Sequence, residues 1–439
     1  DAVEKVAGDK LFSGSYLVSG MVLAQVVSVG ADSYANQLVK QAKTTKKTKS
    51  EIRDSIDKII KILSVFVVPL GIAMFIKEYY FLDLGLKAAV EKTVASIVNM
   101  IPDGLVLLSS VVMAVSVIKL ARQKAIVQGL FSIENLARVD VLCLDKTGTI
   151  TQGTMEVTDE IIFEKEKLHE RICAYLTAIS EDTSTSEAIR KKYSEKINWN
   201  VKQTVDFSSK RKWGAVEFEK EGTFLLGAPE MLLGEAYANY KLQVDPYLER
   251  GERILAFVKL LEGDSKQGRI ERVQLLSFLV LRDNLRPHVK ETLDYFREQG
   301  IRLVLISGDN PKAVMQIGKR AGLSDAENYI DARELKTPEQ IAVAVKRYTV
   351  FGRVTPEQKR ELVQALQHQG HTVAMTGDGV NDVLALKEAD CSIVMGSGCD
   401  VARKTAKVVL ENSDFATMPK ILAEGRRAIN NLERSASLF

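Results

Sequence analysis

The chain has 439 residues, of which 46% are hydrophobic, and its mean hydropathy is −0.03. This length predicts several domains, and a formal net charge of +3 is too small to indicate a nucleic acid partner. The four cysteines have no C-x-x-C spacing, so they indicate neither a disulfide framework nor a zinc site.

The first 39 residues alternate apolar and polar positions between turns, and this alternation predicts β-strands. A strongly basic stretch follows at 40–55. Its cationic residues are Lys40, Lys43, Lys46, Lys47, Lys49 and Arg53. We interpret this run as a solvated stalk that faces a membrane rather than as a nucleic acid patch.

Two long apolar segments follow, at about 56–76 and 90–118. Each is long enough for a transmembrane helix, which needs about 20 residues, and Pro69 is expected to bend the first. Basic residues lie before the first segment and after the second, so the positive-inside rule places both ends in the cytosol. The alternative for each segment is a buried core helix.

The second segment contains Pro102 and Asp103 near its middle. A proline displaces the preceding helical turn, so the carbonyls of Val98, Asn99 and Ile101 can point away from the helix. Freed carbonyls beside a carboxylate form an oxygen-lined cation site, and an acid at mid-membrane is a functional candidate by default. The alternative is a kinked helix that tolerates an acid.

A short apolar run at 139–144 predicts a strand of a parallel sheet, and Asp145 stands at its carboxyl end. Ligands of such sheets bind outside the carboxyl ends of the strands. The residues Lys146 to Gly148 then provide a turn of phosphate size. Asp145 is therefore a candidate phosphoryl acceptor.

Three further segments supply the other groups that phosphoryl transfer to a carboxylate needs. They lie at 303–310, 352–359 and 372–382. Ser307 and Gly308 offer a hydroxyl and an amide, Lys359 offers a cation at the start of a helix, and Asp378 offers an acid for Mg²⁺. The four parts occur in the order that such an enzyme requires.

This set of motifs resembles the P-type ATPases, ion pumps of the haloacid-dehalogenase superfamily that pass through an aspartyl-phosphate. The resemblance implies an α/β fold: a Rossmann-like phosphorylation domain with an inserted α+β nucleotide-binding domain. It also implies a transmembrane helical hairpin and part of a β-rich actuator domain. ATP and Mg²⁺ are the implied substrate and cofactor.

The resemblance assigns a role to each residue of the motifs. It implies that Asp145 is phosphorylated and that Asp145, Asp378 and the Thr147 carbonyl bind Mg²⁺. Lys359, Ser307 and Gly308 would surround the transferred phosphoryl group. Asn381 and Asp382 would lie at the hinge, beside the Mg²⁺. Ser307 stands where most of the family has threonine, and the hydroxyl is retained.

Thr147 separates a pump from a soluble phosphatase of the same superfamily. Soluble phosphatases usually carry a second aspartate two residues after the nucleophile, as a general acid and base. Without that carboxylate the phosphoenzyme should hydrolyse slowly, as suits a pump that couples its lifetime to a conformational change. A soluble-type phosphatase and a module that only binds nucleotide remain the alternatives.

The nucleotide site is expected mainly in the inserted domain at 151–281. By resemblance, Phe207 stacks on the base, Lys212 lies near the phosphates and Gly227 begins the next signature. The remaining nucleotide-binding candidates are Glu187, Arg286, Asp309, Thr147 and Arg353. Leu226 replaces a lysine that usually precedes this glycine.

The segment around Pro102 resembles the fourth-helix motif of calcium and sodium pumps, with Asp103 in place of glutamate and Val106 in place of a second proline. No cysteine flanks Pro102, and the four histidines form no evident ligand cluster. A hard cation is favoured, Ca²⁺ first, with Mg²⁺, Mn²⁺, Na⁺ or K⁺ as alternatives.

The resemblance divides the chain into seven parts. They are 1–39, the end of the actuator domain; 40–55, a basic stalk; 56–118, the third and fourth membrane helices; 119–150 and 282–425, the phosphorylation domain; 151–281, the nucleotide-binding domain; and 426–439, the start of the fifth helix. We expect a fragment of a monomeric, multi-pass pump of the plasma membrane with its catalytic domains in the cytoplasm.

Overall fold

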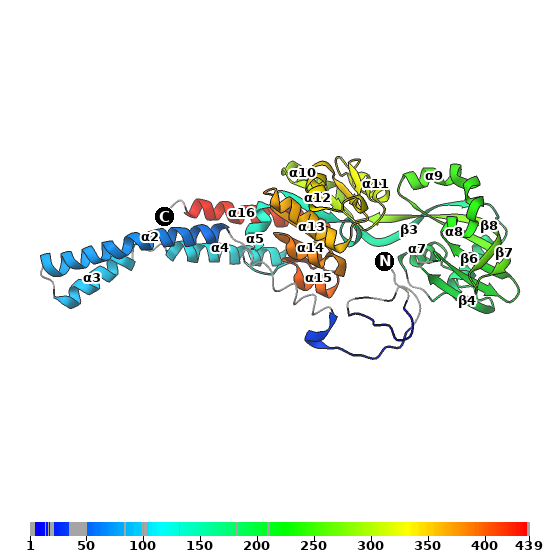
Figure 1. Cartoon of the computed structure of the whole chain (residues 1–439), viewed down its shortest axis with the longest axis horizontal. Coiled ribbons are helices and arrows are strands. Elements are labelled where there is room, and N and C mark those ends of the chain that lie inside the picture. The colour runs from blue at the N-terminus through cyan, green and yellow to red at the C-terminus, as the bar shows by residue number, and fades with distance from the viewer. Residues whose placement is uncertain are drawn as a thin grey trace.

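The computed structural model describes residues 5–13, 15, 17, 22–34, 51–82, 85–98, 100, 103–130, 132–180, 183–208 and 211–436. The described part is elongated, with a helical arm at one end, an α/β domain in the middle and a second, β-rich domain at the other end (Figure 1). We call these the arm, the P domain and the N domain.

The P domain is built on an eight-stranded sheet in the order β1-β14-β13-β12-β2-β9-β11-β10. All neighbours pair in parallel except β1, which is antiparallel to β14. The strands are β1 (Ala125–Val127), β2 (Val141–Asp145), β9 (Arg302–Ile306), β10 (Tyr329–Asp331), β11 (Val350–Gly352), β12 (Val373–Gly377), β13 (Cys391–Met395) and β14 (Val408–Leu410).

Helices cover both faces of this sheet, as the doubly buried strands require. Along β2, Leu142 and Leu144 enter one hydrophobic core, whereas Val141 and Cys143 enter the core on the opposite face. The helices of this domain are α5 (Ser132–Arg138), α10 (Val289–Glu298), α11 (Pro311–Ala321), α12 (Pro338–Arg347), α13 (Pro356–His368), α14 (Val383–Glu388), α15 (Asp400–Thr405) and α16 (Met418–Ala436). The predicted Rossmann-like fold is confirmed.

The N domain is a six-stranded antiparallel sheet in the order β3-β8-β7-β6-β5-β4. Its strands are β3 (Thr151–Ile162), β4 (Val201–Ser208), β5 (Trp213–Phe218), β6 (Gly222–Gly227), β7 (Arg253–Asp264) and β8 (Arg269–Leu285). Its helices are α6 (Leu168–Ala178), α7 (Ser184–Lys192), α8 (Pro229–Leu233) and α9 (Lys241–Glu249). β3 and β8 link it to the P domain, as expected of an inserted domain.

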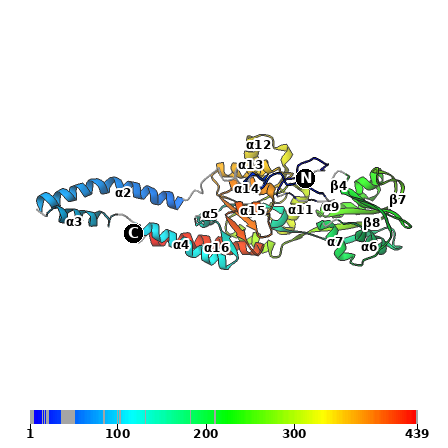
Figure 2. The ribbon, with the colours of Figure 1, turned by 90° about the horizontal axis from the view of Figure 1, so that it is seen from below.

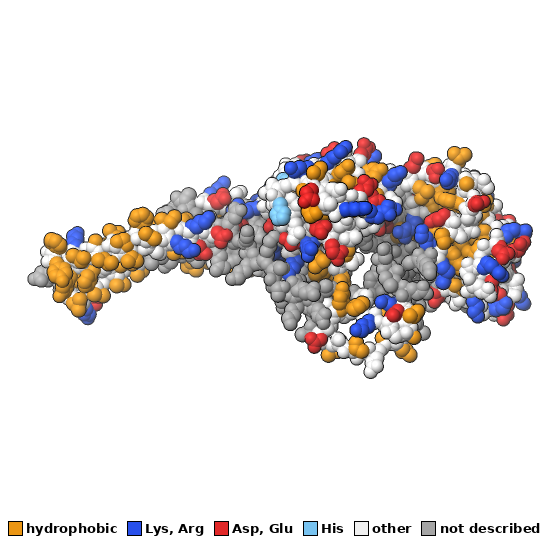
Figure 3. All heavy atoms as spheres, in the orientation of Figure 1, with side chains coloured by type: hydrophobic (Ala, Val, Ile, Leu, Met, Phe, Trp, Pro, Cys, Tyr) orange, Lys and Arg blue, Asp and Glu red, His pale blue; other side chains and the backbone are white. Residues whose placement is uncertain are grey.

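The arm consists of α2 (Glu51–Ile76) with a π-helical turn (Lys77–Phe81), α3 (Leu86–Val98) and α4 (Asp103–Arg122). In the described part of the chain, one helix, Asp57–Phe81, is long and apolar enough to cross a membrane. The second segment predicted to span, 90–118, is instead divided between α3 and α4. Apolar side chains cover the free end of the arm (Figure 3).

The strands predicted for residues 1–39 are not formed in the described parts of that segment. Those parts contain extended chain and one 3₁₀ turn, Gly30–Asp32. The apolar side chains of Leu23 and Val26 are 100% and 76% exposed. An alternating pattern gives a stable sheet only when a partner strand and a core lie beside it, and this segment has neither among the described residues.

Candidate active site

Asp145 ends β2, between β12 and β9 in the sheet. The backbone N–H of Asp145 donates to the Thr376 hydroxyl at 3.2 Å, and the residue is only 5% exposed. Because the carboxyl ends of parallel strands meet at one edge, Asp145 lies beside the loops that follow both neighbouring strands. This position suits a ligand-binding nucleophile.

Lys359 bridges two carboxylates from the first turn of α13. Thr355 caps this helix and forms a capping box with Gln358, with Pro356 at the first helical position. Lys359 Nζ donates to Asp145 Oδ1 at 2.6 Å and to Asp382 Oδ1 at 2.5 Å. Burial opposes the charge of Lys359, but the two carboxylates hold the pKa of its ammonium above the ordinary range.

Asp382 holds the loop after β12. Its second carboxylate oxygen accepts from the N–H groups of Asp378 and Gly379, at 3.2 and 3.1 Å. Oxygens of Asp145, Asp378 and Asp382 lie within 4.8 Å of one another. Carboxylate oxygens are the ligands that Mg²⁺ prefers, so the group fits the expected Mg²⁺ site.

The surroundings of Asp378 and Asp145 disfavour the ionised form of both carboxyl groups. Burial and, next, the negative charge of Asp382 raise the pKa of Asp378 to about 6, against the attraction of Lys359 and Arg286. Burial also raises the pKa of Asp145, which Lys359 opposes. A divalent cation would relieve this repulsion among the acids.

The loop after Asp145, residues Lys146–Ile150, passes close to Asp378. Gly148 has a φ of +69°, and a Cβ built there would lie 1.6 Å from Asp378 Oδ2. Thr147 has an extended backbone and is exposed. Glycine at position 148 therefore permits the contact, whereas the side chain of Thr147 faces solvent.

Ser307 and Asp309 follow β9, the other neighbour of β2. Ser307 is 3% exposed, and its hydroxyl accepts from the Asp309 N–H at 3.2 Å. Ile306 pairs with Asp145 in the sheet, so Ser307 and Gly308 continue directly beside the nucleophile. A Cβ on Gly308 would come no closer than 3.8 Å to another group, the Val354 carbonyl oxygen.

Asn381 and Arg353 lie around this edge. Asn381 is exposed in the 3₁₀ turn Val380–Asp382. Arg353 donates through its backbone N–H to the Asp309 carbonyl at 2.8 Å, while its guanidinium pairs with Asp331 at 3.0 Å. The predicted contacts of these two residues with Mg²⁺ and nucleotide stay predictions.

The nucleotide-binding candidates of the N domain gather where β4, β5 and β6 meet. Trp213 pairs with Ser208, which follows Phe207, and with Gly227. Phe207 is half-buried and Lys212 exposed. The Lys212 ammonium lies 3.5 Å from Glu230. A Cβ on Gly227 would lie 2.4 Å from that of Trp213, so only glycine fits.

The structure says less about the remaining predicted site residues, Glu187 and those of the cation site. Glu187 is exposed on α7, and its contact with the base of the nucleotide stays a prediction. In the arm, Asp103 is the first residue of α4 and Val98 the last of α3. Asn99 and Ile101 lie outside the described residues, so the cation site stays a prediction.

Residues 139–390 match the haloacid dehalogenase-like hydrolase family. The chain belongs to this family. Over the whole chain it is 43% identical to the probable cation-transporting ATPase exp7 of Streptococcus pneumoniae. It is 39% identical to the calcium-transporting ATPase CtpE of Mycobacterium bovis, again over its whole length. The chain spans 57% and 55% of these two proteins.

The fold agrees with these relatives. The crystal structure of a zinc-transporting PIB-type ATPase in the E2.Pi state superposes with a TM-score of 0.68 at 20% identity, covering 93% of this chain and 61% of that one. The superposition confirms the predicted α/β fold class, and the two relatives confirm the predicted resemblance to the P-type ATPases. The matched region of this haloacid dehalogenase-like hydrolase contains all the strand-end residues described above.

One buried side chain of the hydrolase site was missed by sequence reasoning. Lys146 is 6% exposed, and its ammonium lies 2.9 Å from Asp283 and 2.5 Å from Asp309. Burial opposes its charge, but Asp309 and Asp283 hold the pKa of Lys146 above the ordinary value. The sequence shows that Lys146 directly follows the nucleophile. It does not indicate the two acidic partners of Lys146, which are more than 130 residues away in the chain.

Arg286 was predicted to face nucleotide phosphates. In this structure its guanidinium donates to the carbonyl of Gly148, in the hydrolase nucleophile loop, and to that of Ser413, each at 2.7 Å. Burial lowers the pKa of Arg286, though not enough to discharge an arginine. The nucleotide contact stays a prediction, and the observed role is to tie the loop to the segment before α16.

Proposed function

We propose that this chain is the catalytic and coupling part of an ATP-driven cation pump that works through an aspartyl-phosphate on Asp145. The observation that carries the proposal is the position of Lys359, which contacts Asp145 and Asp382 together, beside the Asp378 carboxylate. A buried nucleophile, a fixed cation and a metal-binding acid at one sheet edge are the parts of phosphoryl transfer.

In the proposed reaction a carboxylate oxygen of Asp145 attacks the γ-phosphorus of ATP. A new O–P bond forms, the bond from the γ-phosphorus to the bridging β-phosphate oxygen breaks, and ADP leaves with that electron pair. Lys359 keeps Asp145 ionised and then neutralises charge on the phosphoryl oxygens. Ser307 and Gly308 would donate to the same oxygens from the adjacent strand end.

Asp145, Asp378 and the Thr147 carbonyl would hold Mg²⁺. When bound, the ion supplies positive charge to the phosphate oxygens and lowers the repulsion between the two carboxylates. Asp382 would orient this group, since it already fixes both Lys359 and the Asp378 backbone.

The second half of the cycle returns the enzyme to its starting state. Water attacks the phosphorus, the acyl-phosphate bond breaks, and inorganic phosphate leaves. Thr147 offers no carboxylate at the position where soluble phosphatases of the family use one, so this step is intrinsically slow. A slow step gives time for a conformational change and favours a pump over a soluble phosphatase.

ATP would be held between the two domains. Phe207 would stack on the base, Lys212 would approach the phosphates, and the γ-phosphoryl would reach Asp145. The antiparallel pair β3 and β8 joins the domains, and the shift in its register between Thr151 and Met155 offers a place to bend. Binding across a domain boundary couples nucleotide to domain closure.

The transported ion we propose is Ca²⁺. The carboxylate of Asp103 and carbonyls around Pro102 offer hard oxygen ligands, which Ca²⁺ accepts in irregular geometry. The naming of one relative as a calcium-transporting ATPase supports this choice. The apolar helix Asp57–Phe81 would lie in the plasma membrane, with the P and N domains in the cytoplasm.

Cation-dependent phosphorylation tests the proposal. The natural protein in membranes is incubated with γ-labelled ATP and Mg²⁺, with Ca²⁺, Mn²⁺, Na⁺ or K⁺ added singly, and quenched in acid. We expect label with Ca²⁺ alone, its loss in Asp103→Ala, and its retention in Val111→Ala, an exposed position of the same helix. An amount of labelled phosphoenzyme that does not change with any added cation would contradict the proposal of a cation pump.

A further inference from the structure

Two helices from distant parts of the chain, α4 and α16, lie side by side at the base of the arm (Figures 1 and 2). The buried residues of α4 recur at spacings of four, three and four, which places them on one face of the helix. They are Ser109, Met113, Ser116 and Leu120. Met113 and Leu120 belong to the same hydrophobic core as Ile421, Ala428 and Leu432 of α16.

Glu424 interrupts this apolar contact. It is 8% exposed, accepts a hydrogen bond from the Ser116 hydroxyl at 3.2 Å, and lies 3.8 Å from the Lys119 ammonium. On its own helix it pairs with Arg427. A well-packed apolar side chain at such a position is often at least as stabilising as a buried charge, so stability alone does not account for the acid.

A carboxylate here distinguishes one register of the two helices from the next. If α4 moved by one helical turn along α16, Ser116 would be replaced either by Lys119 and Leu120 or by Val112 and Met113. The first shift would replace the Ser116 hydrogen bond by a closer ion pair with Lys119, which now lies 3.8 Å from the carboxylate, whereas the second would carry both Ser116 and Lys119 away from it. The contacts of Glu424 therefore differ between registers of α4 that are one helical turn apart.

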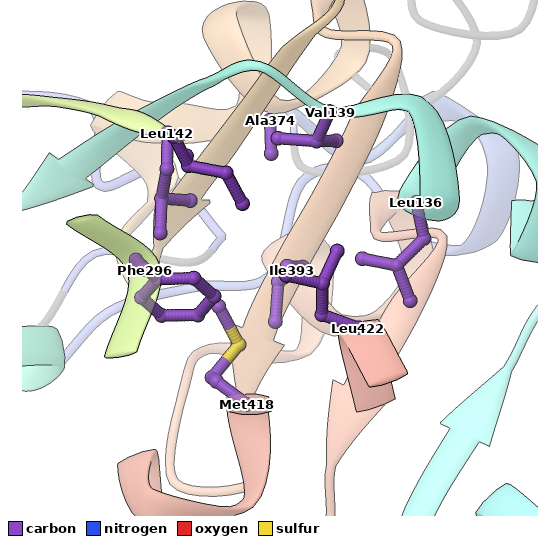
Figure 4. Close-up of a pocket in the computed structure, with 9 residues that line it drawn as sticks. Leu136, Val139, Leu142, Phe296, Ala374, Ile393, Met418 and Leu422 are labelled. Carbon is purple, nitrogen blue, oxygen red and sulfur yellow. The ribbon is translucent and has the colours of Figure 1, made fainter. Parts of the chain in front are cut away.

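α16 is also attached to the phosphorylation site. Leu422 and Met418 line a small apolar cavity together with Leu142 and Phe296 (Figure 4). Leu142 belongs to β2, the strand that ends at Asp145. The segment just before α16 is held by Arg286, which also holds the loop after Asp145. α16 is thus connected by packing to the strand of the nucleophile and through Arg286 to its loop.

The other end of α4 leads to the proposed cation site. Asp103 is the first residue of α4, thirteen residues before Ser116, which is about 20 Å along a helix. A helix that moves as a rigid rod would carry a shift at Ser116 to Asp103 undiminished.

We propose that Glu424 is the positioning residue that couples the phosphorylation site to the cation site, by selecting the register of α4 against α16. This inference rests on the function proposed above and adds to it the residue through which the coupling passes. Glu424 touches neither ATP nor the cation. Its removal should therefore change how phosphorylation depends on the cation, without removing the capacity for phosphorylation.

The test compares three variants of the natural protein in membranes: Glu424→Gln, Ser116→Ala and Glu433→Gln. Glu433 is an exposed acid on α16 and serves as the matched control. For each, acid-stable phosphoenzyme is measured against Ca²⁺ concentration at saturating labelled ATP, together with the Kd for ATP and the thermal unfolding temperature.

We expect Glu424→Gln and Ser116→Ala to shift the Ca²⁺ concentration for half-maximal label by about tenfold, within the usual range of coupling between sites. The maximal label, the ATP Kd and the control should keep their natural values. Ser116→Ala removes one hydrogen bond only, so it decides the question if Glu424→Gln does not fold. Natural Ca²⁺ dependence in both variants would overturn the inference and leave the pump intact, whereas a natural protein without cation-dependent label would overturn both proposals.

Discussion

Gly148 and Asp378 approach so closely that a Cβ on Gly148 would lie 1.6 Å from Asp378 Oδ2. The nucleophile loop and the proposed metal ligand therefore touch, although 230 positions separate them in the chain. The positive φ of Gly148 independently favours glycine. The contact fixes Asp378 against the loop that begins at Asp145, which is where a shared Mg²⁺ would bind.

Gly148→Ala should lower phosphoenzyme formation by about 100-fold, because a displacement of about 1 Å at a reacting centre costs that much. Gly153→Ala is the matched control: Gly153 also has a positive φ, but no atom lies within 4 Å of its Cβ position. The two variants share backbone strain and differ in the clash. Equal activity, measured by labelling rate, would show that the contact does not matter.

Lys359→Gln should lower the labelling rate by at least about 1,000-fold and the free energy of unfolding by about 3–5 kcal/mol, since it leaves two buried carboxylates without their cation. Lys420→Gln, at an exposed lysine of α16, should change neither quantity. Rapid-quench labelling and thermal unfolding check both expectations.

Lys359→Gln should also change the pH dependence of the labelling rate. Lys359 lowers the pKa of Asp145 against the effect of burial, so its removal raises the pKa of the nucleophile. Less of Asp145 is then ionised at neutral pH, and the acid limb of the residual labelling rate should move to higher pH. An unmoved acid limb would mean that Lys359 does not act on the ionisation of Asp145.

Asp378 should destabilise the magnesium-free protein at neutral pH. Its folded-state pKa is about 6, against an ordinary value of 3.8, so the folded state binds the proton more tightly. This contribution is fully favourable below pH 3.8 and is lost as pH rises through 6. At pH 7.5 the free energy of unfolding of Asp378→Asn should therefore exceed that of the natural protein by about 3 kcal/mol.

The difference in the free energy of unfolding between Asp378→Asn and the natural protein should vanish near pH 4. It should also shrink when Mg²⁺ stabilises the natural protein. Calorimetry at the two pH values, with and without Mg²⁺, makes the comparison. A variant less stable than the natural protein at pH 7.5 without Mg²⁺ would contradict the assigned environment of Asp378.

Phe207→Ala should raise the Kd for ATP about tenfold, as expected for the loss of one aromatic stacking contact with a base. Phe163→Ala removes another partly exposed aromatic residue of the N domain and should leave the Kd unchanged. Titration with a fluorescent ATP analogue measures both. A natural Kd in Phe207→Ala would remove this residue from the nucleotide site.

The strand-end residues could be predicted because the geometry of parallel sheets places consecutive carboxyl ends together. Asp145, Ser307 and Asp378 each follow an apolar run, and in the structure they lie at the same edge. Lys359 could be predicted because a threonine and proline mark the start of its helix. Local patterns were sufficient for these four residues.

Contacts set by long-range packing could not be predicted. Nothing near Lys146 in the sequence indicates its pairing with Asp283 and Asp309. The burial of Glu424 likewise depends on a helix 308 positions away from it in the chain. The docking of α4 on α16 is a contact of the same kind, between segments about 300 positions apart in the chain.

The most direct test of the central claim is to locate the phosphoryl group. The natural protein and Asp145→Asn are labelled with γ-labelled ATP, Mg²⁺ and Ca²⁺, quenched in acid, and treated with hydroxylamine, which cleaves acyl-phosphates. We predict hydroxylamine-sensitive label that maps to the peptide containing Asp145 and is absent from Asp145→Asn. Label that persists in Asp145→Asn, or that resists hydroxylamine, would contradict an aspartyl-phosphate at this site.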